Sequence, residues 1–477
     1  MSSNYDYDAI IIGAGISGLV CGCYLAKAGM KTLIVEKNAK PGGYCTSFTR
    51  GGFHFDACVY FLSGFRKGGT FYKIINDLKL NEKLELIKYP IPDVVITPNH
   101  KINLYSDVDK TIYEFQSNFP KEKIKIHDFF KNITSSTSSL IKLKNKTFKG
   151  MVDSYFDDPE LKTILFIPMM GYTGLPPSQL SALAACLVYK EFIFDGGYYP
   201  KGGMQSFADI FLKNFCENGG DMILDRKVKK ISVRDNKVES IILEDDRSIS
   251  GRYLIAACDA YETFFELIGQ QDIPQTIRDK INNMQTSLSA FLVYLGINKN
   301  LREISELKSH TWIIARNYND IERIYTNLFR GVYDYLAISS SSIKNNLSPA
   351  GKESIFLFIN MPFFNKEFWS RENRNKISDD LLKIAEYLIP DISKHIEQMI
   401  TATPNTLLKW TLNFKGAAYG YAATVPQFGD YEFSEKTKIE GLYRVGHWTN
   451  RGGGVISVAN SGYLTAKRIL SHIKNNK

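Results

Sequence analysis

Residues 8–18 read Asp8-Ala-Ile-Ile-Ile-Gly13-Ala-Gly15-Ile-Ser-Gly18, and residues 29–36 read Gly29-Met-Lys-Thr-Leu-Ile-Val35-Glu36. The apolar runs predict two buried strands, and the segment between them predicts a helix that begins in a glycine turn. Gly13 permits the tight turn, Gly15 lets the backbone approach a pyrophosphate, and Gly18 lets the helix pack closely on the strand. The stretch therefore predicts a βαβ unit that binds a dinucleotide.

The carboxylate at the end of the second strand supports this prediction. Glu36 lies 18 residues after Gly18, close to the spacing expected for a group that binds a ribose hydroxyl. The helix N-terminus would present free N–H groups and a positive dipole end to the phosphates. Ser17 in the turn and Lys37 beside Glu36 are further candidate contacts to the cofactor.

The same region also looks like a signal peptide or membrane span, because Ala9 to Ala26 is an uncharged run of eighteen residues. Two acidic residues, Asp6 and Asp8, precede the run in place of a basic region, and glycines interrupt it. We therefore expect a cytoplasmic protein.

Composition narrows the class of protein. The chain has 477 residues, of which 44% are hydrophobic and 13% aromatic, enough for two domains with substantial cores. Its net charge is +9, but the basic residues are scattered, so a nucleic-acid partner is not expected and weak contact with anionic membrane surfaces stays open. The seven cysteines show no metal-ligand spacing, which predicts reduced thiols and no metal site.

Strand and helix signals alternate in three separated blocks, which predicts a discontinuous domain. The second block starts a helix at Gly202-Gly203-Met204 and continues with a predicted hairpin of Val228 to Val233 and Val238 to Leu243. The third block contains Gly446 and a last helix from about Ser457. We assign residues 1–105, 196–275 and 428–477 to the cofactor domain, and residues 106–195 and 276–427 to an inserted α+β substrate domain. Proline and glycine break the 27 uncharged residues between Lys162 and Lys190, which favours buried helices over a membrane span.

Taken in order along the chain, these segments resemble the FAD-dependent phytoene desaturase and carotenoid isomerase family, with retinol saturase as a relative, among the amine-oxidase-like flavoproteins. The resemblance covers nearly the whole chain. It is carried by the opening turn with Glu36, Gly42-Gly43, Phe55-Asp56, Gly202-Gly203-Met204, Val228, Gly416-Ala417-Ala418-Tyr419-Gly420, Leu442 to Gly446 and Gly452-Gly453-Gly454-Val455.

This resemblance implies an α/β fold, with a Rossmann-like FAD-binding domain of the glutathione-reductase type and an inserted substrate domain. It implies that Glu36 holds the adenosine ribose, Val228 the adenine, and Gly446 the pyrophosphate of FAD. Two glycine segments would complete the site: Gly42-Gly43 near the ribityl and phosphate region, and Gly453-Gly454-Val455, which aims a helix N-terminus at the flavin C2 carbonyl.

Two segments depart from the family pattern. His447-Trp448 and Arg451 put bulky polar groups where members usually carry small residues, and Asp56-Ala57-Cys58 replaces Asp-x-Gly. These departures are compatible with an outlying member that acts on a non-carotenoid substrate.

The sequence offers catalytic candidates but no catalytic motif. His54 is expected near the flavin as a base or a structural histidine, and Tyr419 as an aromatic wall on the flavin face. His447 and Arg451 flank the last turn and are suited to a carboxylate or pyrophosphate. Lys409 is expected at the surface, and Cys45 and Cys58 are expected to be small buried residues rather than covalent links to flavin.

Three functions remain open at this point. The first is an FAD oxidoreductase that desaturates, saturates or isomerises double bonds of a long apolar carotenoid-, retinoid- or polyketide-like substrate. The second is a flavin amine or amino-acid oxidase, which His447 and Arg451 would suit. The third is a non-catalytic lipid-binding escort protein of the GDP-dissociation-inhibitor type. The substrate, the electron acceptor and the oligomeric state are not predicted.

Overall fold

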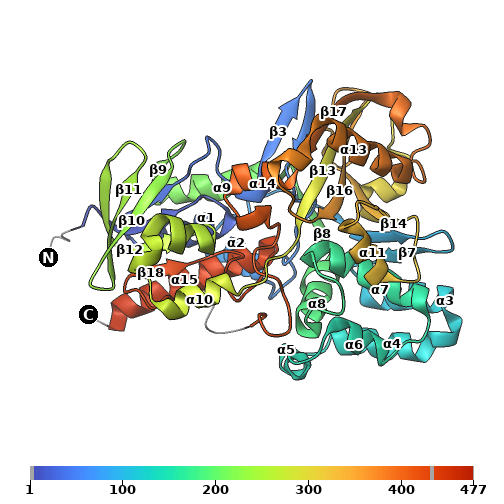
Figure 1. Ribbon diagram of the computed structural model, residues 1–477, viewed down its shortest axis with the longest axis horizontal. Helices are drawn as coiled ribbons and strands as arrows, with labels where there is room; N and C mark the ends of the chain where they lie inside the picture. The colour runs from blue at the N-terminus through green and yellow to red at the C-terminus, as the bar shows by residue number, and fades with distance from the viewer. Residues whose placement is uncertain (1–4, 430–434, 476–477) are drawn as a thin grey trace.

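The computed structural model describes residues 5–429 and 435–475, and its strands form two large sheets joined by several crossings of the chain (Figure 1). The first sheet holds the residues of the opening unit. It consists of β1 (Tyr7–Ile12), β2 (Thr32–Val35), β9 (Asp221–Ile223), β10 (Val228–Arg234), β11 (Lys237–Leu243), β12 (Ser248–Ala256) and β18 (Leu442–Arg444).

The first sheet is parallel around β1, as the buried apolar runs predict. Ala9 pairs with Thr32 of β2 on one side and with Tyr253 of β12 on the other. β9 and β18 extend this parallel region, and β10 and β11 add an antiparallel hairpin next to β12. The predicted strand–helix–strand unit and the predicted hairpin are both confirmed.

Helices cover the first sheet and bring the two ends of the chain together. They are α1 (Ile16–Lys27), α2 (Thr70–Asp77), α9 (Met204–Glu217), α10 (Gln275–Asn282) and α15 (Val455–Asn475). α1 and α15 lie side by side in Figure 1, and they pack so closely that a Cβ on Gly462 would overlap the carbonyl oxygen of Ser17. The last helix is therefore a direct neighbour of the first glycine turn.

The second sheet forms the other large layer. It consists of β6 (Asp93–Ile96), β7 (Lys101–Leu104), β13 (Ser289–Ile297), β14 (His310–Ile314), β15 (Tyr335–Ser340), β16 (Glu353–Met361) and β17 (Ile396–Ala402). Its neighbouring helices are α11 (Ile321–Leu328), α12 (Ser342–Asn345), α13 (Arg371–Ala385) and α14 (Pro404–Thr411).

One predicted boundary is wrong. β6 and β7 lie within residues 1–105, which we assigned to the cofactor domain, but β6 pairs in parallel with β14 of the second sheet. The partner strand lies more than 200 residues away, so the pairing of His310 with Asp93 leaves no trace in local periodicity. Smaller two-stranded pairs, β3 (Ser47–Arg50) with β4 (Phe53–Asp56) and β5 (Leu86–Tyr89) with β8 (Gly197–Pro200), connect the layers.

Residues 106–195 are mainly helical, including the stretch between Lys162 and Lys190 for which we expected buried helices. They form α3 (Val108–Asn118), α4 (Lys123–Ile133), α5 (Thr137–Leu140), α6 (Phe148–Asp153), α7 (Pro159–Thr173) and α8 (Ala182–Val188), followed by a π-helical turn at Tyr189–Ile193. The uncharged stretch after Lys162 forms α7 and α8, whose apolar side chains share one core with the second sheet. Within the two described ranges, we find no helix whose length and apolar character would let it cross a bilayer.

Candidate functional site

A single cavity of about 1450 Å³ extends from the first sheet to the helices of residues 106–195. Single small-molecule sites usually measure roughly 300–1,000 Å³, so this cavity has room for a dinucleotide and a second ligand. Of the thirteen candidate cofactor contacts, Gly18 is the one that is not among the described residues lining the cavity. The other twelve, from Gly13 to Val455, all line it.

The β1–α1 turn forms one end of the cavity. Gly13 has a φ of +105°, and a Cβ there would lie 2.9 Å from the carbonyl oxygen of Ala257. A Cβ on Gly18 would overlap the carbonyl oxygen of Gly13, which explains how α1 approaches the strand so closely. At Gly15 a Cβ would meet no atom of the described residues within 4 Å, because this glycine faces the open cavity.

The N-terminus of α1 is available to a ligand. Gly15 is its N-cap residue, and no side chain in the described part of the chain caps the helix there. Uncapped N–H groups at a helix N-terminus bind phosphate well, because they donate hydrogen bonds and carry the positive end of the helix dipole. The turn therefore provides a place for a pyrophosphate.

Glu36 connects the end of β2 to the same turn. The residue is 7% exposed. Its Oε2 accepts a hydrogen bond from the backbone N of Ala14 at 2.8 Å, and its Oε1 accepts one from the backbone N of Asn38 at 2.9 Å. These donors hold the carboxylate at the cavity wall. Lys37 lies beside it, where burial lowers the pKa of the ammonium group, and Val228 lines the same end.

The Gly42-Gly43 pair passes directly over the glycine turn. The backbone N of Gly42 donates to the carbonyl oxygen of Ala14 at 2.8 Å, and a Cβ on Gly43 would lie 3.3 Å from the Cα of Gly15. A Cβ on Gly42 would lie 3.0 Å from the Cβ of Ala208 on α9, so both positions leave no room for a side chain, and both residues line the cavity.

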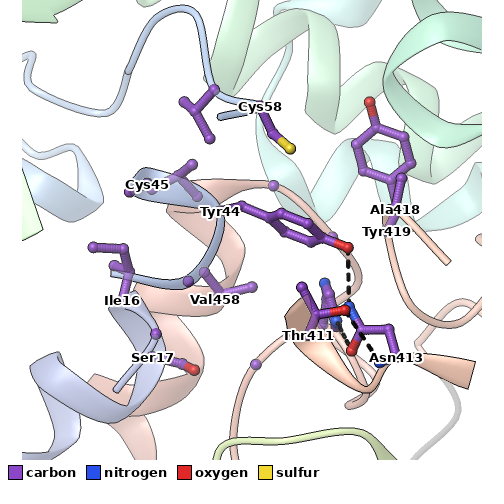
Figure 2. Close-up of a pocket in the computed structure, with 18 of the residues that line it drawn as sticks. Ile16, Ser17, Tyr44, Cys45, Cys58, Thr411, Asn413, Ala418, Tyr419 and Val458 are labelled. Atoms are coloured by element: carbon purple, nitrogen blue, oxygen red, sulfur yellow. Dashed lines mark hydrogen bonds between the residues drawn. The ribbon is translucent and has the colours of Figure 1, made fainter. Parts of the chain in front are cut away.

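The C-terminal glycines bring a second helix N-terminus to the cavity. Gly446 has a φ of +100°, and a Cβ there would lie 3.2 Å from Oγ of Ser17. Gly453 and Gly454 precede α15, which begins at Val455. Figure 2 shows Ile16 and Ser17 of α1 beside Val458 of α15, so the first turns of both helices line one cavity. Two positive helix ends, a glycine turn and a carboxylate suit a dinucleotide such as FAD.

A polar network faces this cavity from the opposite wall (Figure 2). Nδ2 of Asn413 donates to the Tyr44 hydroxyl at 3.1 Å, and Nε1 of Trp448 donates to Oδ1 of Asn413 at 2.9 Å. Nε2 of His447 lies 3.3 Å from the same Oδ1. Because that oxygen can only accept, Nε2 carries the imidazole proton and Nδ1 keeps its lone pair. Sequence reasoning missed Asn413, whose partners are close in space and far apart along the chain.

His447 is neutral at neutral pH. It is reached from the cavity but removed from bulk water, and this desolvation lowers the pKa of its imidazole to about 4. The residue is therefore a hydrogen-bonding group at the site and not a cation.

This shift predicts a pH dependence of stability. The unfolded chain protonates His447 below about pH 6.5, whereas the folded protein resists protonation down to about pH 4, so this group destabilises the fold as pH falls between the two values. We expect His447→Gln to be more stable relative to wild type at pH 4.5 than at pH 7.5, by about 2 to 3 kcal/mol.

Urea unfolding at both pH values, with equal saturating FAD, measures this difference. Burial raises the pKa of Asp259 to about 7, which acts in the opposite direction, but Asp259 is present in both proteins and cancels. His127→Gln, the same substitution at an exposed position on α4, serves as the matched control. An equal stability difference at both pH values would contradict the assignment.

Arg451 is paired within the protein. Its Nε donates to Oε1 of Glu435 at 2.9 Å, and Arg468 lies 3.6 Å from the other oxygen of that carboxylate. The side chain of Glu435 is 2% exposed, and both Glu435 and Arg451 line the cavity. Glu435 therefore holds Arg451 in place, and the single negative charge of this carboxylate is shared with Arg468.

Tyr419 lines the cavity, and its hydroxyl donates to the carbonyl oxygen of Gly171 at 2.9 Å, which fixes the ring between the layers. Cys45 and Cys58 also line it, and burial raises the pKa of both thiols, that of Cys58 to about 12. Because the thiolate is the nucleophile, both cysteines are poor candidates for a covalent link to flavin. Lys409 lies on α14, where its carbonyl oxygen accepts a hydrogen bond from Nζ of Lys37 at 3.0 Å.

The structure places His54 away from the expected position. It is not among the described residues that line the cavity, and its Nε2 lies 3.6 Å from Oδ1 of Asp56 and against Gly203 at the start of α9. Phe53 and Phe55 point into the core, so the strand alternation of β4 turns His54 to the opposite face. Of the four catalytic candidates, the structure brings together Tyr419, His447 and Arg451.

Comparison with known proteins identifies the family to which the chain belongs. The sequence profile described as flavin containing amine oxidoreductase matches residues 16–470. Prolycopene isomerase 2 of an Oncidium hybrid cultivar is 25% identical over 98% of this chain and 84% of that protein. The neurosporene-forming phytoene desaturase of Rhodobacter capsulatus is 25% identical over 97% of this chain and 93% of that protein.

The fold is shared with solved structures. A triple mutant of putrescine oxidase superposes with a TM-score of 0.72 over 98% of this chain and 99% of that one, at 15% identity. At this identity the likeness shows the fold, an FAD domain of the amine-oxidase type with a substrate domain, and no more.

Proposed function

Because this chain belongs to the family of flavin-containing amine oxidoreductases, we propose that this FAD-dependent oxidoreductase desaturates, saturates or isomerises carbon–carbon double bonds of a long apolar substrate. When bound, FAD supplies the group that accepts or donates a hydride. Glu36, Val228 and the turns at Gly15, Gly42 and Gly446 would hold it.

The observation that carries this proposal is the continuation of the cofactor cavity into an apolar region. Toward α8, the π-helical turn and the second sheet, its wall includes the apolar side chains of Ala184, Leu187, Val188, Phe192, Ala290, Leu292 and Phe358. A long hydrocarbon chain would gain hydrophobic stabilisation along this wall. The relatives named for prolycopene and phytoene support double-bond chemistry.

Three parts of the cavity would contribute to the reaction: the N-terminus of α15, His447 and the apolar wall. The N-terminus of α15 would stabilise negative charge on the reduced cofactor, because its N–H groups and dipole end are fixed at the cavity. Neutral His447, oriented by Asn413, would exchange the second proton through the lone pair of Nδ1. The apolar wall would exclude water.

A specific observation argues against the amine or amino-acid oxidase alternative. This alternative relied on His447 and Arg451 to bind a polar, anionic substrate, but His447 is neutral and Arg451 is bound to Glu435. The glycine turn at Gly13 and Gly15 and the carboxylate of Glu36 line the cavity together. A lipid-binding scaffold without FAD would not require these residues, so the escort-protein alternative is disfavoured.

We expect the FAD-loaded protein, mixed anaerobically with phytoene or prolycopene in liposomes, to change the absorbance spectrum of the polyene at a rate at least ten times that of free FAD. Amines and amino acids should release no peroxide in air. Turnover of amines without turnover of polyenes would support the oxidase, and a colourless protein that takes up no FAD would support the escort reading.

The enzyme would meet such a substrate at a membrane surface. Long apolar molecules reside in membranes, and the net charge of +9 favours contact with anionic surfaces. We therefore propose a cytoplasmic enzyme that contacts the membrane peripherally.

A further inference from the structure

Most basic residues of the chain are scattered, but one segment beside the cavity concentrates them. Residues 129–152 contain five lysines and no acidic residue: Lys131, Lys142, Lys144, Lys146 and Lys149. The first and the last of these are paired with Asp109 and Asp153. Lys142, Lys144 and Lys146 are exposed, and no carboxylate in the described ranges lies within ion-pair distance of them. The segment therefore presents three uncompensated positive charges close together.

Two of these lysines line a second, smaller hollow of about 270 Å³. Its lining residues come from α4, from α6 and its C-terminal end, and from the chain between the two helices: Asn132, Lys142, Leu143, Lys146, Met151, Ser154 and Tyr155. The hydroxyl of Tyr155 accepts a hydrogen bond from Nδ2 of Asn132 at 3.0 Å, so its own proton is available to a ligand. None of the described lining residues is acidic. Two ammonium groups and a hydroxyl donor suit an anion with several oxygen atoms, such as a phosphate group.

The core beneath the hollow holds it in shape. Leu143 is buried in the core that the helices share with the second sheet. The ring of Tyr155 packs edge-on against Phe129 of α4, with centroids 5.4 Å apart. The backbone N of Ala182, at the start of α8, donates to the carbonyl oxygen of Lys146 at 2.9 Å. The basic segment is therefore fixed to α8, the helix that forms part of the apolar cavity wall.

The same segment reaches the cavity. Thr137, on α5, lines the cavity, and Ile141, four residues later, is 57% exposed. In Figure 1, α4, α5 and α6 lie along the lower edge of the molecule, with α8 above α5. An exposed isoleucine next to lysines suits a bilayer surface, where the apolar side chain enters the acyl region while the ammonium groups stay at the phosphates.

A nucleic acid suits this segment less well than a membrane. Residues 129–152 contain no arginine, and their phenylalanines are all buried, so the segment has no exposed ring on which a base could stack. The exposed apolar side chain is an isoleucine, which a bilayer accommodates and a nucleic acid does not use.

We propose that residues 137–155 form a docking surface for a membrane of anionic phospholipids. The hollow at Lys142 and Lys146 receives a lipid phosphate group, and Ile141 enters the bilayer beside it. This inference rests on the proposed function, since a long apolar substrate that resides in the bilayer would be taken up at the part of the cavity beside Thr137.

Binding of the FAD-loaded protein to lipid vesicles tests the docking surface. Co-sedimentation compares vesicles of phosphatidylcholine alone with vesicles of phosphatidylcholine and phosphatidylglycerol at a ratio of about 2:1. The wild type should bind the anionic vesicles at least about 25-fold more tightly, because each lysine near an anionic surface contributes about fivefold. Raising the ionic strength to about 0.5 M should remove most of this preference.

Three variants separate the hollow from general electrostatic attraction. Lys142→Gln/Lys146→Gln should lower the affinity for anionic vesicles by about 25-fold. Lys366→Gln/Lys376→Gln removes the same charge from exposed positions just before and on α13, at the opposite edge of the molecule in Figure 1, and should change the affinity by less than about twofold. Tyr155→Phe keeps the charge and removes a donor from the hollow, so binding should weaken by about threefold.

Several results would overturn the docking surface and leave the proposed enzyme intact. These are equal binding to both kinds of vesicle, wild-type binding by Lys142→Gln/Lys146→Gln, and displacement from the vesicles by about 10 mM inorganic phosphate at constant ionic strength, which would mean a site for free phosphate. Tighter binding to a single-stranded RNA than to anionic vesicles, through the same two lysines, would identify a nucleic acid as the partner instead.

The failure of the proposed function would look different. Turnover of a polyene in detergent micelles does not require docking, so it should be equal in the wild type and in Lys142→Gln/Lys146→Gln. A protein that binds anionic vesicles through these lysines but converts no polyene, in vesicles or in detergent, would refute the proposed reaction and leave the docking surface in place.

Discussion

Glu36→Arg should give a protein that purifies without yellow colour and binds added FAD at least about 100-fold more weakly than the wild type. The variant loses a charge-assisted hydrogen bond to the ribose, worth about 1.5–3 kcal/mol, and places a longer cation against the adenosine end. It also loses the acceptor for the backbone N–H groups of Ala14 and Asn38, so the cavity wall itself would change.

The measurement is the ratio of flavin to protein absorbance after purification, followed by titration of the apoprotein with FAD. Glu36→Gln keeps an acceptor oxygen and loses the charge, so its affinity should fall by about tenfold. Glu239→Arg reverses a charge on the exposed side of β11 and should remain fully yellow. A yellow Glu36→Arg protein with wild-type affinity would refute the assignment of the adenosine end.

Alanine at Gly18 should lower the stability of the fold, and alanine at Gly15 should lower the affinity for FAD, although the two glycines are only three residues apart. At Gly18 the new Cβ overlaps the carbonyl oxygen of Gly13 and lies 3.1 Å from the Cβ of Ala257, so α1 has to move away from the sheet. We expect the free energy of unfolding to fall by about 3 kcal/mol, as for other overpacked cores.

At Gly15 the new Cβ enters the cavity, and the backbone needs no change because its φ is −67°. Unfolding of the apoprotein should therefore stay within about 0.5 kcal/mol of wild type, while FAD affinity falls by about tenfold or more because the methyl group blocks the pyrophosphate. Urea unfolding of the apoproteins and FAD titration measure the two quantities separately. Equal losses of stability in both variants would mean that the roles of the glycines are not divided in this way.

The sequence was most informative where structure is local. The apolar strands around Gly13, the helix after it and Glu36 lie within 30 residues, and each signal acts on its neighbours. The same holds for the hairpin from Val228 to Leu243, whose strands are adjacent in the chain. These segments were predicted correctly because periodicity and turn residues describe them completely.

Residues that meet through the tertiary fold were not predictable in this way. His54 was expected beside the flavin because it follows Gly42-Gly43, but the face of β4 that it occupies depends on where Phe53 and Phe55 find their core. Asn413 carries no motif, and its importance appears only when His447 and Trp448 are placed around it. The boundary error at β6 has the same origin, since its partner strand is distant in the chain.

The packing of α15 against α1 has a consequence for how the protein is made. β1 and the first glycine turn leave the ribosome early, but β18 and α15, which complete the sheet and supply the second helix N-terminus, follow more than 400 residues later. At synthesis rates of about 5–20 residues per second, this delay is roughly 20 to 90 seconds. During that time the nascent chain has an unfinished binding site, so the complete cofactor site forms only after β18 and α15 have been made. Cellular FAD supply would then affect how many finished chains mature, and not how the early segments fold.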